Sequence, residues 1–202
     1  MKDLKKKKDE TPEEKEARIK KEKTDKNAPK IEKLEASKTK AKEAYDAVDA
    51  GNKIEKAKAK IAFVKVQLEL AKLKGADIVI GTDPDSDRVG IAIKDDKNQY
   101  IIVNGNQMMI MLTDYLLSKR KQLDKSYFIG STIVSTQMMF NVAKSYNVDI
   151  KLGLTGFKWI AKMIHDFPNQ KFIGGGEESY GYMVGDFVRD KDAITSSLLA
   201  CE

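Results

Sequence analysis

Apolar residues recur at helical spacing from residue 61 onward, and short apolar runs then alternate with further helical stretches. Ile61, Val64, Leu68 and Ala71 mark one face of a helix that Gly75 is expected to end. The runs that follow predict strands over 76–82, 89–94 and 100–103, with a turn at 95–98 before the third strand.

The second half of the chain continues this alternation of helix and strand. Helices are predicted over 107–119, 137–146 and 157–166, strands over 127–131, 148–154 and 171–174, and a last helix from near Asp192. Alternation of this length favours an α/β fold, a mostly parallel mixed sheet with helices on both faces. Met108, Met109, Met111 and Leu112 are expected to fill the core of that fold.

Residues 1–60 follow a different pattern, rich in Lys, Glu and Ala and poor in large apolar side chains. Thr11 followed by Pro12 and Glu14 is typical of a helix start. A second helix is predicted from Pro29 to Ala50, with Gly51 ending it. Because so little apolar surface is available, we expect a charged helical leader that is weakly packed and partly disordered.

Charge is distributed unevenly between these two parts. Residues 1–74 hold 23 Lys and Arg against 15 Asp and Glu, a net charge of +8, while residues 75–202 have a net charge of −2. The single cysteine, Cys201, excludes an internal disulfide and fits a reducing compartment. No apolar run approaches the roughly 18 residues of a membrane helix, and no secretory signal is visible. The sequence therefore predicts a cytoplasmic protein that does not enter a membrane.

Candidate chemistry is concentrated directly after the predicted strand 76–82, where Asp83, Asp85 and Asp87 occupy alternate positions. Alternate side chains of an extended segment point to the same side, so these carboxylates are expected to converge. Hard oxygen donors of this kind suit Mg²⁺, which usually keeps positions for water or phosphate.

Two other structures can contain an acidic run of this kind. A calcium EF-hand loop needs Gly at its sixth position and Glu at its twelfth, where this chain has Arg88 and Lys94. An acidic surface turn built on Pro84 and Ser86 remains open.

Four segments together resemble the phosphohexomutase family, which includes phosphoglucomutases and phosphomannomutases. Asp83, Asp85, Asp87 and Arg88 match its D-x-D-x-D-R metal loop, and Gly176 to Gly181 resembles its sugar-recognition loop in the glucose-type form. Thr155 to Ile160 and Arg189 to Asp192 resemble two further active-site segments. The resemblance spans about residues 62–202.

This resemblance implies transfer of a phosphoryl group between the 1- and 6-positions of a hexose, by way of an enzyme serine and a bisphosphate. The implied ligands are glucose 1-phosphate, glucose 6-phosphate and glucose 1,6-bisphosphate, with Mg²⁺ as cofactor. By the same resemblance, the metal ligands are Asp83, Asp85 and Asp87, the catalytic residues Arg88 and Lys191, and the substrate-binding residues Glu177, Ser179, Gly156 and Lys158. Arg88 would steady the phosphate, and Lys191 would contact an anion or move a proton.

Plainer interpretations of these residues also stay open. Glu177 and Glu178 would form a solvated acidic pair, the glycines at 174–176 a flexible loop, and Lys158 an ordinary surface lysine. His165, the only histidine, is assigned to the surface or to a helix C-terminus.

Nothing in the chain matches the family's serine loop or its final phosphate-binding domain. The resemblance therefore implies a central fragment: a leader at 1–60, the end of the second family domain at 61–104 and a truncated third domain at 105–202. Such a fragment is expected to be inactive alone, with the missing mutase domains as partners.

A second hypothesis is a non-catalytic interaction protein whose basic leader binds an acidic partner or nucleic acid. The run Lys5 to Lys8 motivates it. Against nucleic acid, the lysines of the leader alternate with acidic residues, and aromatic residues for base stacking are almost lacking there.

Overall fold

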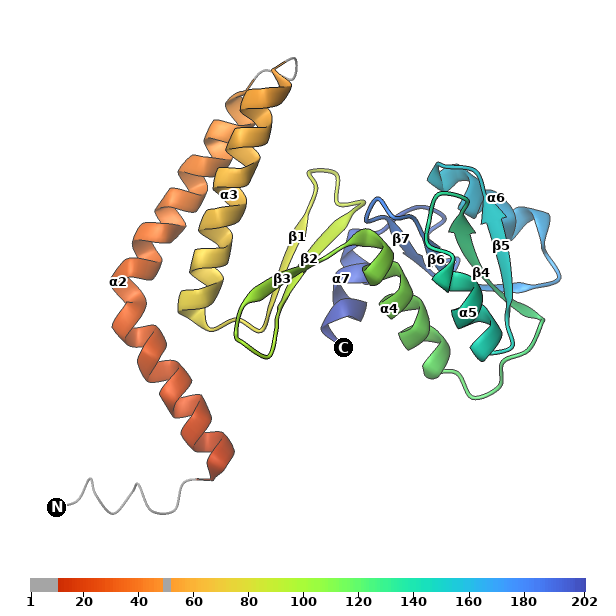
Figure 1. Cartoon of the computed structure of the whole chain (residues 1–202), viewed down its shortest axis with the longest axis horizontal. Coiled ribbons are helices and arrows are strands. Elements are labelled where there is room, and N and C mark those ends of the chain that lie inside the picture. The colour runs from red at the N-terminus through yellow and green to blue at the C-terminus, as the bar shows by residue number, and fades with distance from the viewer. Residues whose placement is uncertain (1–10, 49–51) are drawn as a thin grey trace. The chain divides into compact units, whose positions relative to one another are not determined.

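The computed structural model describes residues 11–48 and 52–202, in two compact units (Figure 1). The first unit ends at Val79 and the second begins at Ile80, so the division falls within the strand β1 (Ile78–Thr82). The N-terminal unit is mainly helical, and the C-terminal unit mixes strands and helices.

Among the described residues of the N-terminal unit, the helices α2 (Pro12–Ala47) and α3 (Lys53–Lys74) pack side by side. The predicted start of α2 is confirmed, because the Glu14 amide donates to Thr11 Oγ1 at 3.2 Å and the Thr11 amide donates to Glu14 Oε2 at 2.9 Å. These reciprocal bonds satisfy backbone groups that a helix start leaves unpaired. Gly75 ends α3 with φ 64°, as predicted.

The helical unit corrects two sequence predictions. Pro29 lies inside one continuous helix instead of starting a second one, and α3 begins at Lys53 instead of Ile61. An interior proline costs a backbone hydrogen bond, but packing of a long helix against its neighbour can outweigh that loss. Ile31 and Leu70 are buried in this hairpin, so α2 packs more firmly than its sparse apolar pattern predicts.

Some predictions for the leader lie outside the described residues. They are the helix end at Gly51 and the lysine run from Lys5 to Lys8. The described part of the leader is helical from Pro12 to Ala47.

The C-terminal unit begins with a three-stranded sheet in the order β1-β2-β3, in which β2 (Val89–Lys94) and β3 (Tyr100–Val103) pair antiparallel. Ile91 faces Val103 in this register, and the predicted turn over 95–98 joins the two strands. The Asp95 carboxylate closes that turn by accepting hydrogen bonds from the amides of Lys97 and Gln99.

A four-stranded sheet follows, in the order β5-β4-β6-β7. The strands β5, β4 and β6 are parallel, and only β7 runs antiparallel, which confirms the predicted mostly parallel sheet. Its elements are α4 (Gly105–Ser118), β4 (Tyr127–Thr132), α5 (Met138–Ser145), β5 (Asp149–Gly153), α6 (Phe157–Asp166), β6 (Lys171–Gly176), β7 (Tyr182–Val184) and α7 (Ala193–Cys201).

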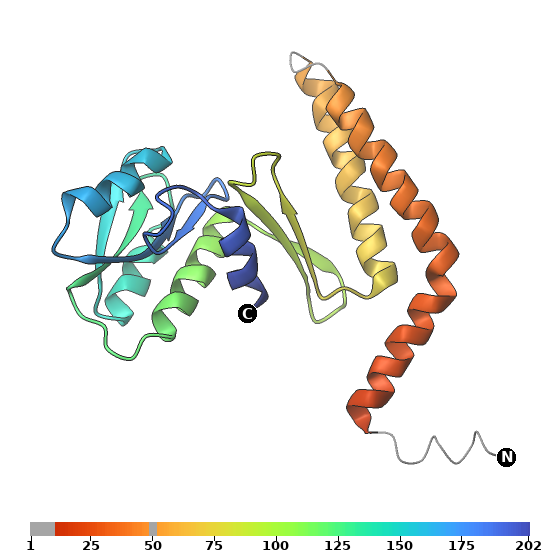
Figure 2. The same ribbon diagram turned by 180° about the vertical axis from the view of Figure 1, so that it is seen from behind.

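Helices cover both faces of this sheet (Figures 1 and 2). On one face, Phe128 of β4 belongs to a buried cluster with Phe157, Ile160 and Met163 of α6. On the other face, Ser131 of β4 lies against Met109 of α4. Right-handed crossovers through α5 (β4 to β5) and α6 (β5 to β6) would place these two helices on opposite faces, because the two connections run in opposite directions across the sheet.

One core prediction and one interpretation that stayed open need correction. Met111 is 54% exposed, since it projects outside the arc of α4 that Met108, Met109 and Leu112 bury. The glycines at 174–176 lie within β6 and form no flexible loop. Gly175 lies so close to the Gly130 backbone of β4 that a methyl group would overlap it, so close strand approach explains the glycine.

Along the described residues, no helix combines the length and the apolar character needed to cross a membrane.

Tyr182 provides a test of this core. Its side chain is 1% exposed and its hydroxyl lies 2.9 Å from Thr113 Oγ1. Burial raises the pKa of Tyr182 well above its usual value of 10.0, so the phenol ionises at lower pH in the unfolded chain than in the folded one. The free energy of unfolding should therefore decrease as the pH rises above 10.

We expect Tyr182→Phe to lose about 1 kcal/mol at pH 7, because Thr113 loses its partner, and to show a smaller decrease above pH 10. Urea unfolding at pH 7, 10 and 11 measures both effects. Tyr127→Phe, at a half-buried tyrosine of β4, should keep the parent's pH dependence. Parallel decreases for the parent and Tyr182→Phe would contradict the assignment.

Candidate functional site

The acidic run after β1 forms a closed turn. The Ser86 amide donates to the Asp83 carbonyl at 3.1 Å, the Asp83 amide donates to the Arg88 carbonyl at 3.3 Å, and Ser86 has φ 55°. One carboxylate oxygen from each of Asp83, Asp85 and Asp87 lies within 4.8 Å of the others. Convergence is thus confirmed, but a turn produces it and not the expected extended segment.

Backbone amides and two cationic side chains face these carboxylates. Asp83 Oδ1 accepts hydrogen bonds from the amides of Asp87 and Arg88 at 3.1 and 3.0 Å. Lys191 Nζ lies 2.8 Å from Asp87 Oδ2, and Arg88 Nε lies 3.4 Å from Asp87 Oδ1 and 3.6 Å from Asp83 Oδ2. Arg88 therefore turns the Nε side of its guanidinium toward the aspartates.

The donor set fits a hard divalent cation. Asp87 Oδ1 is buried and accepts no hydrogen bond from any described residue. A buried carboxylate oxygen without a donor costs about 1–3 kcal/mol, a cost that a bound cation would remove. Three carboxylates with the buried oxygen among them form an acidic group that could bind a metal ion.

The segment 177–181 connects β6 to β7 and presents a buried carboxylate. Glu177 is 6% exposed, and its Oε1 accepts a hydrogen bond from the Gly156 amide at 2.7 Å. Its own amide donates to the Gly181 carbonyl at 2.9 Å, which closes the loop. The solvated acidic pair is therefore wrong for Glu177, and its hydrogen bond to Gly156 joins two segments that are far apart in the sequence.

Backbone contacts join the aspartate turn to this loop. Arg88 forms an isolated antiparallel bridge with Gly181, and the Val89 amide donates to the Tyr180 carbonyl at 3.2 Å. The Ala193 amide, at the start of α7, donates to the Ser86 carbonyl at 3.0 Å. Four segments that are far apart in the sequence thus meet near the carboxyl ends of parallel strands, where open α/β sheets place their ligands.

The remaining predicted site residues lie in less constrained positions. Ser179 is half-buried within the 177–181 loop. Lys158 is exposed, with its Nζ 5.4 Å from the centre of the Trp159 ring, as a surface lysine would be. His165 lies exposed in the last turn of α6, which agrees with its prediction.

The sequence analysis did not identify the residues outside the 177–181 loop that contact Glu178 and fix the position of the loop. The Ser135 hydroxyl donates to Glu178 Oε2 at 3.1 Å and lies 2.8 Å from Thr132 Oγ1. Gly105, at the start of α4, lies so close to the Glu178 carbonyl that a methyl group would overlap it. The only sequence signal was position, since Ser135 follows the carboxyl end of a predicted strand.

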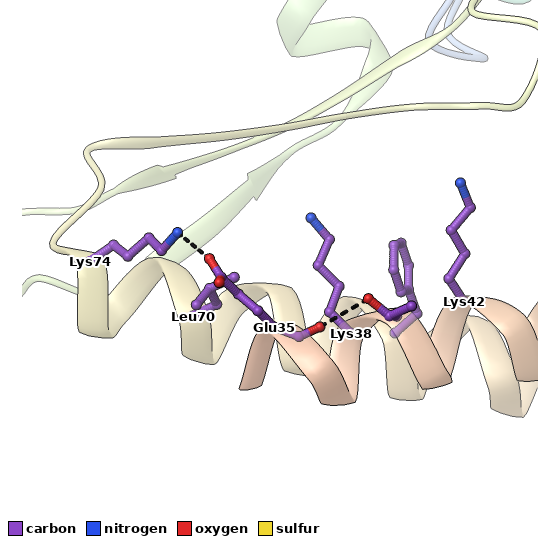
Figure 3. Close-up of a pocket in the computed structure, with 7 residues that line it drawn as sticks. Glu35, Lys38, Lys42, Leu70 and Lys74 are labelled. Carbon is purple, nitrogen blue, oxygen red and sulfur yellow. Dashed lines mark hydrogen bonds and ion pairs between the residues drawn. The ribbon is translucent and has the colours of Figure 1, made fainter. Parts of the chain in front are cut away.

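A separate cleft of about 370 Å³ lies on the helical hairpin (Figure 3). It is lined by Glu35, Lys38, Thr39, Lys42, Phe63, Leu70 and Lys74. Lys74 Nζ pairs with Glu35 Oε1 at 2.5 Å, an exposed ion pair that contributes about 1 kcal/mol at most. None of the motif residues lies in it.

Known proteins resemble this chain in sequence and in fold. A family model described as phosphoglucomutase/phosphomannomutase, alpha/beta/alpha domain III, matches residues 104–202. The phosphoglucomutase of Staphylococcus epidermidis is 46% identical over 128 residues, which cover 63% of this chain. That of Staphylococcus aureus is 43% identical over the same length. The match covers 23% of each relative, so this chain spans about a quarter of their length.

Two solved structures share the fold. A putative phosphomannomutase from Thermus thermophilus matches with a TM-score of 0.52 and 24% identity, over 60% of this chain and 25% of that one. A phosphoglucomutase/phosphomannomutase family protein from Burkholderia thailandensis matches with a TM-score of 0.53 and 16% identity, over 65% of this chain and 27% of that one.

Fold and site together define an α/β protein with an acidic turn and a carboxylate-bearing loop at the carboxyl ends of its parallel strands. Through residues 104–202, the chain is similar to the third domain of phosphoglucomutases and phosphomannomutases, which are alpha-D-phosphohexomutases.

Gly105 tests how the loop is positioned. We expect Gly105→Ala to displace the backbone at Glu178 and to lower the free energy of unfolding by about 1–3 kcal/mol, because a well-packed contact has no room for a methyl group. Gly81→Ala is the matched control, since a methyl group there meets no atom within 4 Å. Urea unfolding and backbone amide chemical shifts measure the two changes. Equal changes in the free energy of unfolding and in the chemical shifts of the two variants would show that the close approach of Gly105 to Glu178 does not position the loop.

Proposed function

We propose that this chain carries the metal-binding and sugar-recognition parts of a phosphoglucomutase-type phosphohexomutase, which interconverts hexose 1-phosphates and hexose 6-phosphates through a bisphosphate. The observation that carries the proposal is the meeting of two acidic groups. Three carboxylates gather within 4.8 Å, and backbone contacts link their turn to the loop that presents the buried Glu177. The identity to two phosphoglucomutases supports the glucose-type assignment.

In this proposal, Asp83, Asp85 and Asp87 hold Mg²⁺, and Arg88 contacts the phosphate. When bound, Mg²⁺ supplies charge stabilisation to a phosphoryl group in transfer. The chain's own contribution is positioning, since hydrogen bonds from the amides of Asp87 and Arg88 fix the orientation of the Asp83 carboxylate.

Sugar recognition is assigned to Glu177 and Ser179, with Lys158 as an additional anion contact. The Gly156 amide occupies Glu177 Oε1, so a sugar hydroxyl would bind at Oε2. A site that is built to hydrogen-bond hydroxyls discriminates well, because a wrong ligand leaves a buried acceptor unpaired. Glucose 1-phosphate, glucose 6-phosphate and glucose 1,6-bisphosphate are the proposed ligands.

We further propose that residues 61–104 and 105–202 correspond to the end of the second and to the third family domain, behind a leader at 1–60. Turnover by these 202 residues would then need further family domains, because they span only about a quarter of the length of the relatives they match. A cytoplasmic location remains a prediction from the cysteine count. The interaction-protein hypothesis is not favoured, since the family model matches residues 104–202, which contain three of the four motifs.

Metal binding tests the aspartate turn. Mn²⁺, a paramagnetic substitute for Mg²⁺, should bind the 202-residue chain, and Asp85→Asn should weaken binding about tenfold or more because one of three charged ligands is lost. Electron paramagnetic resonance of free Mn²⁺ measures the affinity. Asp96→Asn, in the exposed turn 95–98, is the charge-matched control and should bind as the parent does. Unchanged binding by Asp85→Asn would refute the metal assignment.

Sugar-phosphate binding tests the 177–181 loop. Calorimetric titration with glucose 1-phosphate in the presence of Mg²⁺ should show binding that Glu177→Gln weakens about tenfold, since a charged acceptor is worth more than a neutral one. Glu43→Gln, on the exposed side of α2, should match the parent. A coupled assay should detect no conversion to glucose 6-phosphate by the chain alone. Conversion above the uncatalysed rate would refute the need for further domains.

A further inference from the structure

The Lys191 side chain lies in a slot between Gly181 and the Phe157 ring. The other cationic side chains of the site have no such slot. The aliphatic chain of Lys191 runs along Gly181, where a methyl group would overlap it, and its ammonium lies 5.7 Å from the centre of the Phe157 ring. The side chain is 18% exposed, against 54% for Arg88. In this position, Lys191 Nζ lies 2.8 Å from Asp87 Oδ2.

The slot is made from the same segments that build the sugar loop. Gly181 closes the 177–181 loop, and Phe157 follows Gly156, whose amide orients Glu177. Any movement of the Lys191 side chain is therefore confined by the residues that would contact a sugar ligand.

Asp87 has two oxygens in contrasting situations. Oδ2 pairs with Lys191, while Oδ1 is buried and accepts no hydrogen bond within the described part of the chain, with Arg88 Nε 3.4 Å away as an ion-pair partner. A divalent ion among the three carboxylates would lie within a few ångströms of the Lys191 ammonium. Like charges at that separation repel strongly in a partly buried site, where screening is weak.

We propose that Lys191 is an internal counter-ion of the aspartate turn, which competes with the divalent metal for Asp87 and is displaced when the metal binds. This inference rests on the proposed metal site and adds a positioning role to it. Metal loading frees one positive charge beside the 177–181 loop, where the phosphate of a sugar ligand needs it. The divalent ion thus replaces the Lys191 ammonium as the cation that neutralises Asp87.

The test compares Mn²⁺ affinity in the parent, Lys191→Met and Lys191→Arg. Methionine keeps the chain along Gly181 without the charge, so Lys191→Met should bind Mn²⁺ about tenfold tighter, because removal of a like charge favours the ion. Lys191→Arg keeps the charge and should stay near the parent. Lys144→Met, at an exposed lysine of α5, controls for net charge. Lys191→Gln replaces Lys191→Met if the latter fails to fold.

The outcomes separate this inference from the metal site itself. Binding by the parent with no gain in Lys191→Met overturns the counter-ion role and leaves the metal site standing. Binding by Lys191→Met alone supports competition in its strongest form. If neither the parent nor Lys191→Met binds Mn²⁺, both the counter-ion role and the metal site are overturned. In the parent, ¹³C-labelled lysine should show the Lys191 side-chain resonances shifting as Mg²⁺ is added, and Asp87→Asn should shift them without metal.

Discussion

Charge compensation at the aspartate turn is the constraint on which the rest of the site depends. Three carboxylates within 4.8 Å of one another repel unless positive charge meets them. Here that charge comes from Arg88, within the turn itself, and from Lys191, which arrives from the segment before α7. Because Lys191 reaches Asp87 past Gly181, compensating the charge also draws the 177–181 loop and α7 against the turn.

The sheet architecture makes this meeting possible. Parallel strands end at a common edge, so the segments after β4, β5 and β6 begin as neighbours. Short polar contacts then fix them, with Gly156 holding the Glu177 carboxylate and Ser135 holding Glu178. Glycine is required where backbones approach closely, as Gly105 does behind Glu178. The buried cluster around Phe128 and Ile160 supports this edge from beneath.

Much of the local structure could be predicted, because the signals are local. The helix over 157–166 was predicted with the bounds that it has, and Gly75 and Asp192 mark a helix end and a helix start as expected. Predictions were wrong where packing outweighed propensity. Pro29 lies within α2, and Met111 faces outward. The glycines at 174–176, for which a flexible loop had stayed open, continue β6 because the neighbouring strand approaches closely.

By itself, the sequence determined the order of elements, the four motifs and the expectation that Asp83, Asp85 and Asp87 converge, since each depends on residues that are near one another in the chain. Only the tertiary structure decided that a turn brings the aspartates together, that Lys191 pairs with Asp87 and that Ser135 supports Glu178. The physical reason is distance along the chain. Such partners lie many residues apart, and no spacing rule selects one lysine or serine among many until the strands and helices have packed.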